Sequence, residues 1–294
     1  MEKASLEHAD VLTQELLRLT SFASDLFRED FMALLYPDDL SDKRVFDARY
    51  AQVAVFLISK AILAQLEHWG ISSNVLLGHS VGEYTAASYA GILDENATVR
   101  LLQKRAELVC KTRAARMLAI TGNNVRIPHD VEVSAILSND MKCVVGSPKS
   151  IEDLIKQLGQ QKVPYKELTT SHGFHTSMMT AIRKDFEKLL KSVRFHPGEK
   201  NIVSNVDGRI ITDFNIDYCC EHMIQPVNLK KCLDTILTNK DIRVIIEIGP
   251  SGILKHLVDE RNSEIRIIST VKGRSKSSKV HSQLFQSLAD LWAS

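Results

Sequence analysis

The stretch VLLGHSVGEYTAAS, residues 75–88, places Ser80 between Gly78 and Gly82 directly after an apolar run. An apolar run that passes at once into an alanine-rich segment predicts a buried strand, a tight turn and a helix. The pattern Gly-x-Ser-x-Gly is typical of a nucleophile elbow, because glycines keep side chains out of a crowded turn. Free N–H groups at the start of the following helix can stabilise an oxyanion. This stretch therefore predicts that Ser80 is presented as a nucleophile.

The composition is that of an ordinary globular protein and excludes some functions. The chain has 294 residues, 44% of them hydrophobic and 25% charged, which suits one large domain or a domain with a smaller insertion. The formal net charge of +1 gives no global electrostatic case for binding nucleic acid or an anionic membrane. The basic stretch VKGRSKSSK, residues 271–279, is interpreted as a solvated loop.

The cysteines and the terminal segment indicate a compartment. Five cysteines follow no metal-ligand spacing, so the sequence predicts no metal site, and an odd count suits a reducing environment. Residues 1–20 are charged and amphipathic, unlike a signal peptide. No apolar run reaches the roughly 18 residues of a membrane span. We therefore expect a soluble cytoplasmic protein.

Helical periodicity dominates both ends of the chain, and short β-prone runs fill its middle. Residues 8–70 are mostly helical, and the runs between 117 and 168 predict a small inserted module with one helix at 150–160. Further helices are expected over residues 82–93, 96–115, 176–193 and 278–294. Strands that alternate with helices predict an α/β fold with a mainly parallel sheet covered on both faces.

A serine hydroxyl needs a base within hydrogen-bond reach before it can act as a nucleophile. The stretch SHGFHTSMM, residues 171–179, carries His172 and His175 where the inserted module passes into the next helix. On this pattern alone two readings stay open. Either one of these histidines is the base, or both are exposed loop residues.

The motifs of the chain, taken in order, resemble those of one enzyme family. GHSVGE at 78–83 and HGFH at 172–175 resemble signatures of malonyl-CoA:acyl carrier protein transacylases and of polyketide-synthase acyltransferase domains. Later matches, in the family's order, are LLQKRAELV at 101–109, IVSNVDG at 202–208, QPVNL at 225–229 and IEIGPSGIL at 246–254. The resemblance spans residues 20–293.

The resemblance implies a fold of two parts. Residues 1–116 and 179–294 would form an α/β-hydrolase-like large subdomain with a parallel sheet, which carries the nucleophile elbow. Residues 117–178 would form a small inserted ferredoxin-like α+β subdomain, which carries the catalytic histidine.

The resemblance also assigns catalytic roles. Ser80 would be acylated by a CoA thioester and would then release the acyl group to the phosphopantetheine thiol of a carrier protein. His175 would be its general base, oriented by the backbone carbonyl of His222, and the Val81 N–H would be an oxyanion donor. Because only the carbonyl of His222 is used, we expect that changing His222 matters much less than changing His175.

Four residues match substrate-binding positions of the family. Arg105 would receive the free carboxylate of a malonyl-type substrate, since a guanidinium binds a planar carboxylate through two hydrogen bonds. The alternative is that Arg105 is an exposed helix charge. Phe174 would fill the space of an α-methyl group and so favour malonyl over methylmalonyl units, while His79 and Asn139 would line the acyl site.

Asn139 is one of three residues that match polar positions of the family, together with Asn205 and Gln52. The alternative is that these three residues simply satisfy buried backbone groups.

The chain departs from the family's pattern in two places. The family normally has an early strand followed by a Gly-Gln-Gly turn that supplies a second oxyanion donor, and this chain has no such stretch. The inserted module normally carries a helix after its first strand, but residues 122–130 are few and include a proline, so we expect that helix to be reduced.

These features lead to one preferred function and two alternatives. We expect an S-acyltransferase that moves a malonyl-type group from CoA to an acyl carrier protein in fatty-acid or polyketide synthesis. The alternatives are an acyl hydrolase that clears carrier-bound acyl groups and a degenerate, non-catalytic module that docks a carrier protein. The expected partners are the carrier protein, the acyl-CoA substrate and other synthase modules, without nucleic acid or membrane. No metal or bound cofactor is implied, because CoA and phosphopantetheine are substrate groups.

Overall fold

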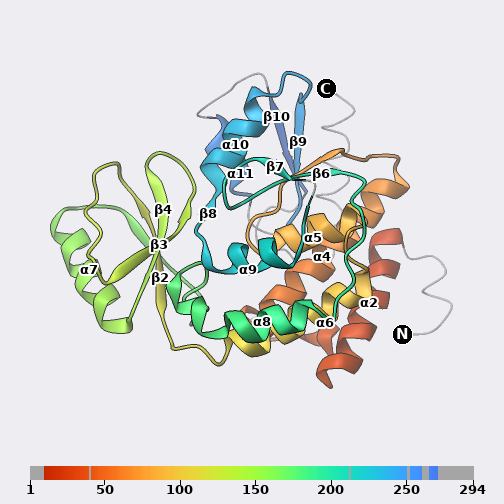
Figure 1. The fold of residues 1–294 in the computed structure, drawn as a ribbon, viewed down its shortest axis with the longest axis horizontal. Helices are drawn as coiled ribbons and strands as arrows, with labels where there is room; N and C mark the ends of the chain where they lie inside the picture. The colour runs from red at the N-terminus through yellow and green to blue at the C-terminus, as the bar shows by residue number, and fades with distance from the viewer. Residues whose placement is uncertain (1–9, 40, 212, 250–251, 260–264, 271–294) are drawn as a thin grey trace. The chain divides into compact units, whose positions relative to one another are not determined.

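The fold is seen in a computed structural model (Figure 1). It describes residues 10–39, 41–211, 213–249, 252–259 and 265–270. The basic stretch at 271–279 and the helix expected at 278–294 lie outside the described residues.

The chain divides into two compact units. The first consists of residues 1–42, 54–73 and 236–294, and the second of residues 43–53 and 74–235. The subdomain boundaries expected around residues 117–178 stay a prediction.

The first unit combines helices with one parallel strand pair. Its described helices are α2 (Val11–Phe27), α3 (Phe31–Leu35), most of α4 (Ala48–His68) and α11 (Leu254–Asp259). Strand β9 (Val244–Glu247) pairs in parallel with β10 (Arg266–Ser269). Apolar side chains from two of the helices form a shared core, namely Leu12, Leu16, Ala61, Ile62 and Leu66.

Helix α2 begins and ends at residues that suit those positions. The side chain of Asp10 accepts a hydrogen bond from the Thr13 N–H at 2.8 Å, which satisfies one of the free donors of the first turn. The helix ends at Arg28, whose φ of 56° lies in the left-handed region. The amphipathic pattern between these residues buries Leu16 and Leu19.

One described helix is long and apolar enough to cross a membrane by length and composition alone. Helix α4 has 21 residues and an 18-residue window of mean hydropathy 1.2. This helix contains no uninterrupted apolar run of about 18 residues, because polar residues such as Gln52 and Ser59 lie within it. The protein buries 61% of that window, as it would for the core helix of a soluble protein.

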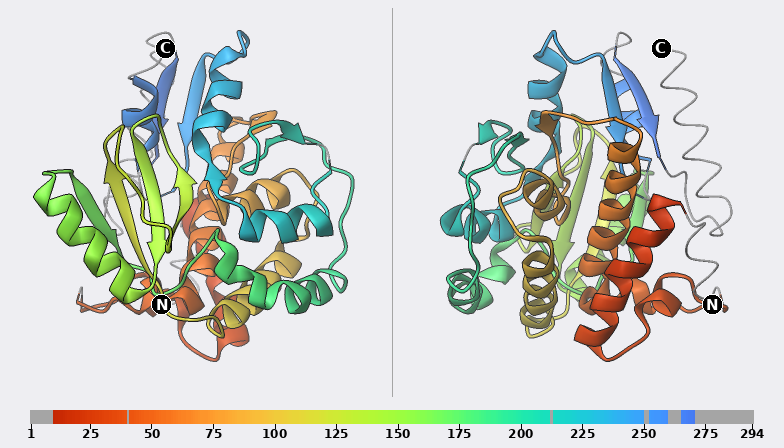
Figure 2. Two further views of the ribbon diagram at one scale, coloured as in Figure 1. Left: turned by 60° about the vertical axis from the view of Figure 1, so that its left-hand side comes forward. Right: turned by 90° about the vertical axis from the view of Figure 1, so that its right-hand side faces the viewer.

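The second unit contains two sheets (Figure 2). The smaller has the order β1-β6-β7, with β1 (Val75–Leu76), β6 (Asn201–Val203) and β7 (Ile210–Ile211). β1 and β6 are parallel, and β7 is antiparallel to β6. Strand β1 covers only 2 residues of the apolar run before Ser80 that predicted it, and it is half-buried.

The larger sheet has the order β5-β2-β4-β3-β8. Its strands are β2 (Arg116–Thr121), β3 (Val131–Ile136), β4 (Met141–Gly146), β5 (Tyr165–Leu168) and β8 (Val227–Asn228). The first four pair antiparallel, and β8 joins β3 in parallel. Residues 122–130 contain only turns and loop, so the expected reduction of the module's first helix is confirmed.

Helix α7 (Pro148–Gln160) covers one face of the larger sheet (Figure 2). Ser147 caps it by accepting from the Ser150 N–H at 3.1 Å, and Pro148 suits the first helical turn. Its apolar stripe packs against strands β2 and β4 through Ile151, Leu154, Leu158, Leu118, Ile120 and Val144. This packing makes the inserted module a two-layer α+β structure with its own core.

The second unit also contains 3₁₀ turns and further helices among its described residues. They are the 3₁₀ turns η1 (Arg44–Phe46) and η2 (Ser177–Ile182) and the helices α5 (Gly82–Tyr89), α6 (Glu95–Val109), α8 (Arg183–Leu190), α9 (Ile216–Ile224) and α10 (Leu229–Thr238), the last of which continues into the first unit. The segment expected as one helix over 176–193 is thus a 3₁₀ turn followed by α8.

Helix α6 is shorter than the span 96–115 expected for it. It starts one residue earlier, at Glu95, because Asp94 is its N-cap and the Asp94 carbonyl accepts from the Thr98 N–H at 2.8 Å. It ends at Val109, where the Thr112 N–H donates to the Val109 carbonyl and tightens the chain into a turn before β2.

Candidate active site

Ser80 lies at the apex of the turn between β1 and α5, as the nucleophile-elbow pattern predicts. Its φ is 54°, in the left-handed region that non-glycine residues rarely adopt. The other described non-glycine residues with positive φ are Arg28, Lys162 and His175, the last with a φ of 58°. Both members of the proposed catalytic pair are therefore held in backbone conformations that the local sequence alone disfavours.

Gly78 is required by the close approach of the chain to itself. A Cβ at this position would lie 2.1 Å from the backbone nitrogen of Glu83 and 2.2 Å from the backbone carbon of Gly82. At Gly82, by contrast, a Cβ would meet nothing within 4 Å. Close backbone approach therefore explains the glycine at position 78 but not the glycine at position 82.

We expect Gly78→Ala to destabilise the fold by at least about 3 kcal/mol, because rigid backbone must move to admit a methyl group. Gly82→Ala is the matched control, and it should leave stability unchanged or raise it by about 0.5–1 kcal/mol, since Gly82 begins a helix. Chemical denaturation of the two variants measures the difference. Equal midpoints for both variants would contradict the close approach at Gly78.

The amide of Asn205 holds both sides of the elbow. Its Oδ1 accepts from the Ser80 N–H at 2.7 Å, and its Nδ2 donates to the Gly78 carbonyl at 2.6 Å. Asn205 lies in the turn after β6 and is completely buried. The sequence identifies Asn205 only as a match to a polar position of the family, or as a residue that satisfies buried backbone groups. No local signal in the sequence could have found this role, because its contacts join Asn205 to residues 125 and 127 positions away.

His175 is brought to Ser80 across 95 positions of sequence. Its Nε2 lies 2.6 Å from Ser80 Oγ, and its Nδ1 lies 2.9 Å from the carbonyl oxygen of His222. A carbonyl oxygen can only accept, so Nδ1 carries the proton and Nε2 is left to accept from the serine hydroxyl. His175 is only 4% exposed, so the alternative of an exposed loop residue is wrong for it, and its role as the general base stays a prediction.

Burial is the main cause of the low pKa of His175, and the nearby Arg105 guanidinium adds to it. Together they lower the pKa of this imidazole to about 3. The ring is therefore neutral at physiological pH and has a free lone pair on Nε2. A neutral imidazole beside a serine hydroxyl is the arrangement that general-base catalysis needs.

Arg105 is buried on α6, with 1% of its side chain exposed, so the alternative of a helix-surface charge is wrong. Its Nη1 donates to Gln52 Oε1, and its guanidinium carbon lies 5.6 Å from the ring centre of Tyr84 and 6.0 Å from that of Phe186. No carboxylate among the described residues forms an ion pair with it. Two buried donors, Arg105 Nε and Gln52 Nε2, also have no acceptor within the described part of the chain.

A buried guanidinium without a counter-ion is unfavourable unless a ligand supplies the negative charge. Together with the two unpaired donors, this cation forms a site whose charge and hydrogen bonding suit a carboxylate. Gln52 shares this arrangement through its contact with Arg105, and its role in binding a ligand stays a prediction.

The other predicted site residues are spread over the same unit. Val81 is the N-cap of α5, and its N–H donates to no acceptor among the described residues, as an oxyanion donor requires. His79 is exposed beside Ser80. Phe174 is half-buried against the cluster of Ala115, Met117 and Val145. Asn139 lies exposed in the bend between β3 and β4, and its role in substrate binding stays a prediction.

The imidazole of His222 is buried as well as its carbonyl. Its ring is 1% exposed and stacks on Tyr218, with ring centres 6.1 Å apart. A change at His222 therefore removes packing in addition to any effect on its backbone, and the expectation that it matters less than a change at His175 stays a prediction.

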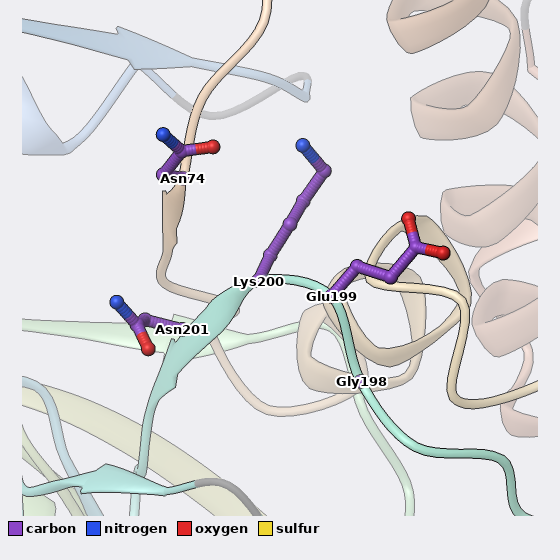
Figure 3. A pocket seen from close by; sticks show the side chains of 5 residues that line it. All are labelled: Asn74, Gly198, Glu199, Lys200 and Asn201. Atoms are coloured by element: carbon purple, nitrogen blue, oxygen red, sulfur yellow. The ribbon is translucent and has the colours of Figure 1, made fainter.

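Ser80 and His175 do not line the open polar pocket of the second unit. No group of three or more His, Cys, Asp or Glu residues in the described part of the chain could hold a metal ion. The open polar pocket of the second unit is lined by Asn74 and residues 198–201. Figure 3 shows the extended side chains of Glu199 and Lys200 in this lining. None of the predicted site residues lines this pocket.

The family model that describes the acyl transferase domain matches residues 10–281. This chain belongs to the acyl transferase domain family. It is 26% identical over 272 residues to the non-reducing polyketide synthase VdtA of Byssochlamys spectabilis, an alignment that covers 88% of this chain and 12% of the synthase. It is 27% identical over 222 residues to the spectinabilin polyketide synthase system protein NorB of Streptomyces orinoci, which covers 72% of this chain and 10% of that protein. This acyltransferase chain thus spans a small part of the length of these curated relatives.

Solved structures share its fold at lower sequence identity. The acyltransferase domain from the second module of the salinomycin polyketide synthase aligns with a TM-score of 0.83 and 20% identity, covering 99% of this chain and 69% of that one. The malonyl CoA-acyl carrier protein transacylase of Clostridium perfringens aligns with a TM-score of 0.76 and 20% identity, covering 96% of this chain and 92% of that one. These likenesses confirm the predicted acyltransferase fold, a large α/β subdomain with a smaller ferredoxin-like one.

Proposed function

We propose that this acyltransferase moves a malonyl-type acyl group from CoA to the phosphopantetheine thiol of an acyl carrier protein, through an ester on Ser80. The observation that carries the proposal is the contact of 2.6 Å between Ser80 Oγ and His175 Nε2, in the same unit as a buried Arg105 that lacks a carboxylate partner among the described residues. Membership of the acyl transferase domain family supports the reaction class. The names of the aligned relatives support a place in polyketide or fatty-acid synthesis.

In the first half-reaction, Ser80 Oγ attacks the thioester carbonyl carbon while its proton passes to His175 Nε2. The carbonyl electrons move onto oxygen, where the Val81 N–H stabilises the negative charge. When the C–S bond breaks, the leaving thiolate of CoA takes the proton from His175. Ser80 is left as an ester and His175 is neutral again.

The second half-reaction repeats these steps with a different thiol. His175 Nε2 takes the proton from the phosphopantetheine thiol, whose sulfur attacks the ester carbonyl carbon. The C–Oγ bond breaks and Ser80 recovers its proton from His175. Throughout, the Nδ1–H of His175 remains on the His222 carbonyl, which keeps the ring in one tautomer and orientation.

Charge at Arg105 links acyl selection to the base. Its guanidinium contributes to the low pKa of His175, second only to burial. A bound carboxylate would cancel that positive charge and raise the pKa of His175. A carboxylated acyl group therefore makes His175 a stronger base at the moment when it is needed, whereas an acetyl group does not. We expect the reaction to take place in the cytoplasm, with carrier protein and other synthase modules as partners and no bound cofactor.

Intact-protein mass spectrometry tests this proposal directly. We expect incubation with malonyl-CoA to add one malonyl group to the wild-type chain, with less addition from methylmalonyl-CoA and acetyl-CoA. Ser80→Ala should gain no acyl mass, because it lacks the attacking oxygen. Addition of a carrier protein should then transfer the group to its phosphopantetheine thiol. An acyl mass on Ser80→Ala, or release of free acid faster than transfer to carrier protein, would overturn the proposal, the second result in favour of a hydrolase.

A further inference from the structure

The carboxyl group of Glu83 is fully buried in the first turn of α5, and the reaction steps above make no use of it. Its side chain is 0% exposed. Oε1 accepts the backbone N–H of Asn205 at 2.5 Å, and the Tyr218 hydroxyl lies 3.0 Å from Oε1 and 2.8 Å from Oε2. Burial of a carboxyl group is unfavourable unless its oxygen atoms find hydrogen-bond partners. The partners of Glu83 lie in two segments of the second unit.

The first segment that Glu83 fixes is the turn that holds the elbow. Besides donating its N–H to Glu83, Asn205 binds the Ser80 N–H and the Gly78 carbonyl through its side chain. Its own carbonyl accepts from the Asn228 N–H at 2.7 Å. With every polar group of Asn205 engaged, a displacement of its backbone is passed on to the backbone of Ser80.

The second segment is α9, which carries the acceptor for the base. Tyr218 and His222 lie one helical turn apart, so they share a face of α9. The Tyr218 hydroxyl contacts the Glu83 carboxyl, and His222 Nε2 lies 3.5 Å from Glu83 Oε2. The carbonyl of the same His222 accepts from His175 Nδ1. Glu83 thus contacts both the segment that positions the nucleophile and the segment that orients the base.

We propose that Glu83 is a positioning residue, which sets the Ser80 backbone through Asn205 and the His175 acceptor through Tyr218 and α9. The proposal rests on the proposed function in that Ser80 is taken as the nucleophile. Loss of the carboxyl would leave the Asn205 N–H and the Tyr218 hydroxyl without this acceptor, and both segments would shift. A misplacement of about 1 Å between reacting groups lowers a rate by about 100-fold.

The neutral form of the carboxyl suggests a conservative replacement. Burial raises the pKa of Glu83 to about 8, so the group is protonated at pH 7. Glutamine has the same shape as the neutral acid and offers one acceptor oxygen and one donor group. In the Glu83→Gln variant, the side-chain oxygen can keep the Asn205 N–H while the amide N–H₂ faces Tyr218 and His222.

The test measures the nucleophilicity of Ser80 with diisopropyl fluorophosphate, a small neutral probe that needs neither CoA nor a carboxylate. Ser80 Oγ forms a bond to phosphorus, fluoride leaves, and His175 takes the hydroxyl proton. Intact mass spectrometry follows the labelled fraction with time, with Ser80→Ala as the blank. If malonyl-CoA failed to acylate Ser80, the proposed function would fall, while this labelling would still report the geometry of the pair.

We expect Glu83→Ala to be labelled about 100-fold more slowly than wild type, and Glu83→Gln to stay within about 10-fold of it. Leu154→Ala removes a buried side chain from the α7 core, away from the Glu83 contacts, and serves as the control for lost stability. All labelling rates are measured well below the melting temperature of each variant. Under those conditions we expect Leu154→Ala to be labelled within about threefold of the wild-type rate.

Labelling of folded Glu83→Ala within about threefold of wild type would overturn the proposal. Equal slowing of Leu154→Ala and Glu83→Ala would overturn it too, since general loosening would then explain both. If Glu83→Ala gives no folded protein, Tyr218→Phe decides. That variant loses the hydroxyl contacts with the carboxyl and with Ser204 Oγ, and it keeps the contact between Glu83 and the Asn205 N–H. Slowing of about fivefold or more supports the proposal, and labelling at the wild-type rate overturns it.

Discussion

His175→Ala is expected to slow acylation of Ser80 by about 10⁴-fold with a nearly unchanged KM for malonyl-CoA. The variant removes the acceptor that lies 2.6 Å from Ser80 Oγ, and no other imidazole among the described residues lies within hydrogen-bond reach of that oxygen. The rate of acyl-enzyme formation in a quenched-flow experiment measures the effect. It reports the chemical step before any carrier protein is needed.

His172→Ala is the matched control, because His172 lies three residues away in the same loop and is half-buried. Its Nδ1 lies 2.9 Å from Ser171 Oγ, a contact outside the catalytic pair. We expect its acylation rate to stay within about threefold of wild type. A loss at His172 as large as that at His175 would contradict the assignment of the base.

The low pKa of His175 fixes the pH dependence expected for the wild type. A histidine is an active base above its pKa, and a value of about 3 leaves the ring neutral throughout pH 5–7. The acylation rate should therefore show no acidic limb in that range. The same shift lowers stability in acid: the unfolded chain gains a proton on this ring below about pH 6.5 and the folded chain does not, so the free energy of unfolding falls as pH drops from there.

Arg105→Met is expected to lose about 100-fold in the preference for malonyl-CoA over acetyl-CoA. The variant removes the cation that would bind the free carboxylate and keeps a side chain of similar length. The ratio of kcat/KM for the two thioesters is the measurement. Because the guanidinium contributes to the low pKa of His175, the pKa of that ring should also rise in the variant.

The same variant should unfold at a higher temperature than wild type. An ion buried without a partner is costly, and its replacement by an apolar side chain of similar volume is often stabilising by about 1–4 kcal/mol. Arg105→Lys is the control: it keeps the positive charge without the planar fork, so selectivity should be intermediate and stability should not rise. An Arg105→Met protein with wild-type selectivity would show that the carboxylate binds elsewhere.

Local sequence patterns were sufficient for the elbow and for most of the helices. The apolar run before Ser80 and the glycines beside it predict the strand, the turn and the helix, since each depends on neighbouring residues. The ends of α6 were less well predicted, because its N-cap, Asp94, makes no side-chain capping hydrogen bond and helix ends are the least certain part of a sequence-based prediction.

The site was predicted only as far as the resemblance reached. Nothing in the residues around His175 fixes its partner, and 95 positions separate it from Ser80. The roles of Asn205, Gln52 and Tyr218 could not be predicted, because each depends on a contact between segments far apart in sequence. The burial of Arg105 excludes the alternative of an exposed helix charge. Burial of a charged side chain follows from tertiary packing, so helical periodicity could not predict it.

The parallel pairing of β8 with β3 has a mechanical consequence for the base. Helix α9, which ends at Ile224, leads within three residues into β8 and so anchors the His222 carbonyl to the larger sheet. The loop of His175 is anchored to the start of that sheet as well, by the bridge between His172 and Ala114. A hinge motion that drew the larger sheet away from Ser80 would therefore move the His175 ring and the His222 carbonyl together as one rigid group. Such a motion would separate His175 from Ser80 and the Tyr218 hydroxyl from the Glu83 carboxyl, while the His222 carbonyl would keep the proton of the ring on Nδ1.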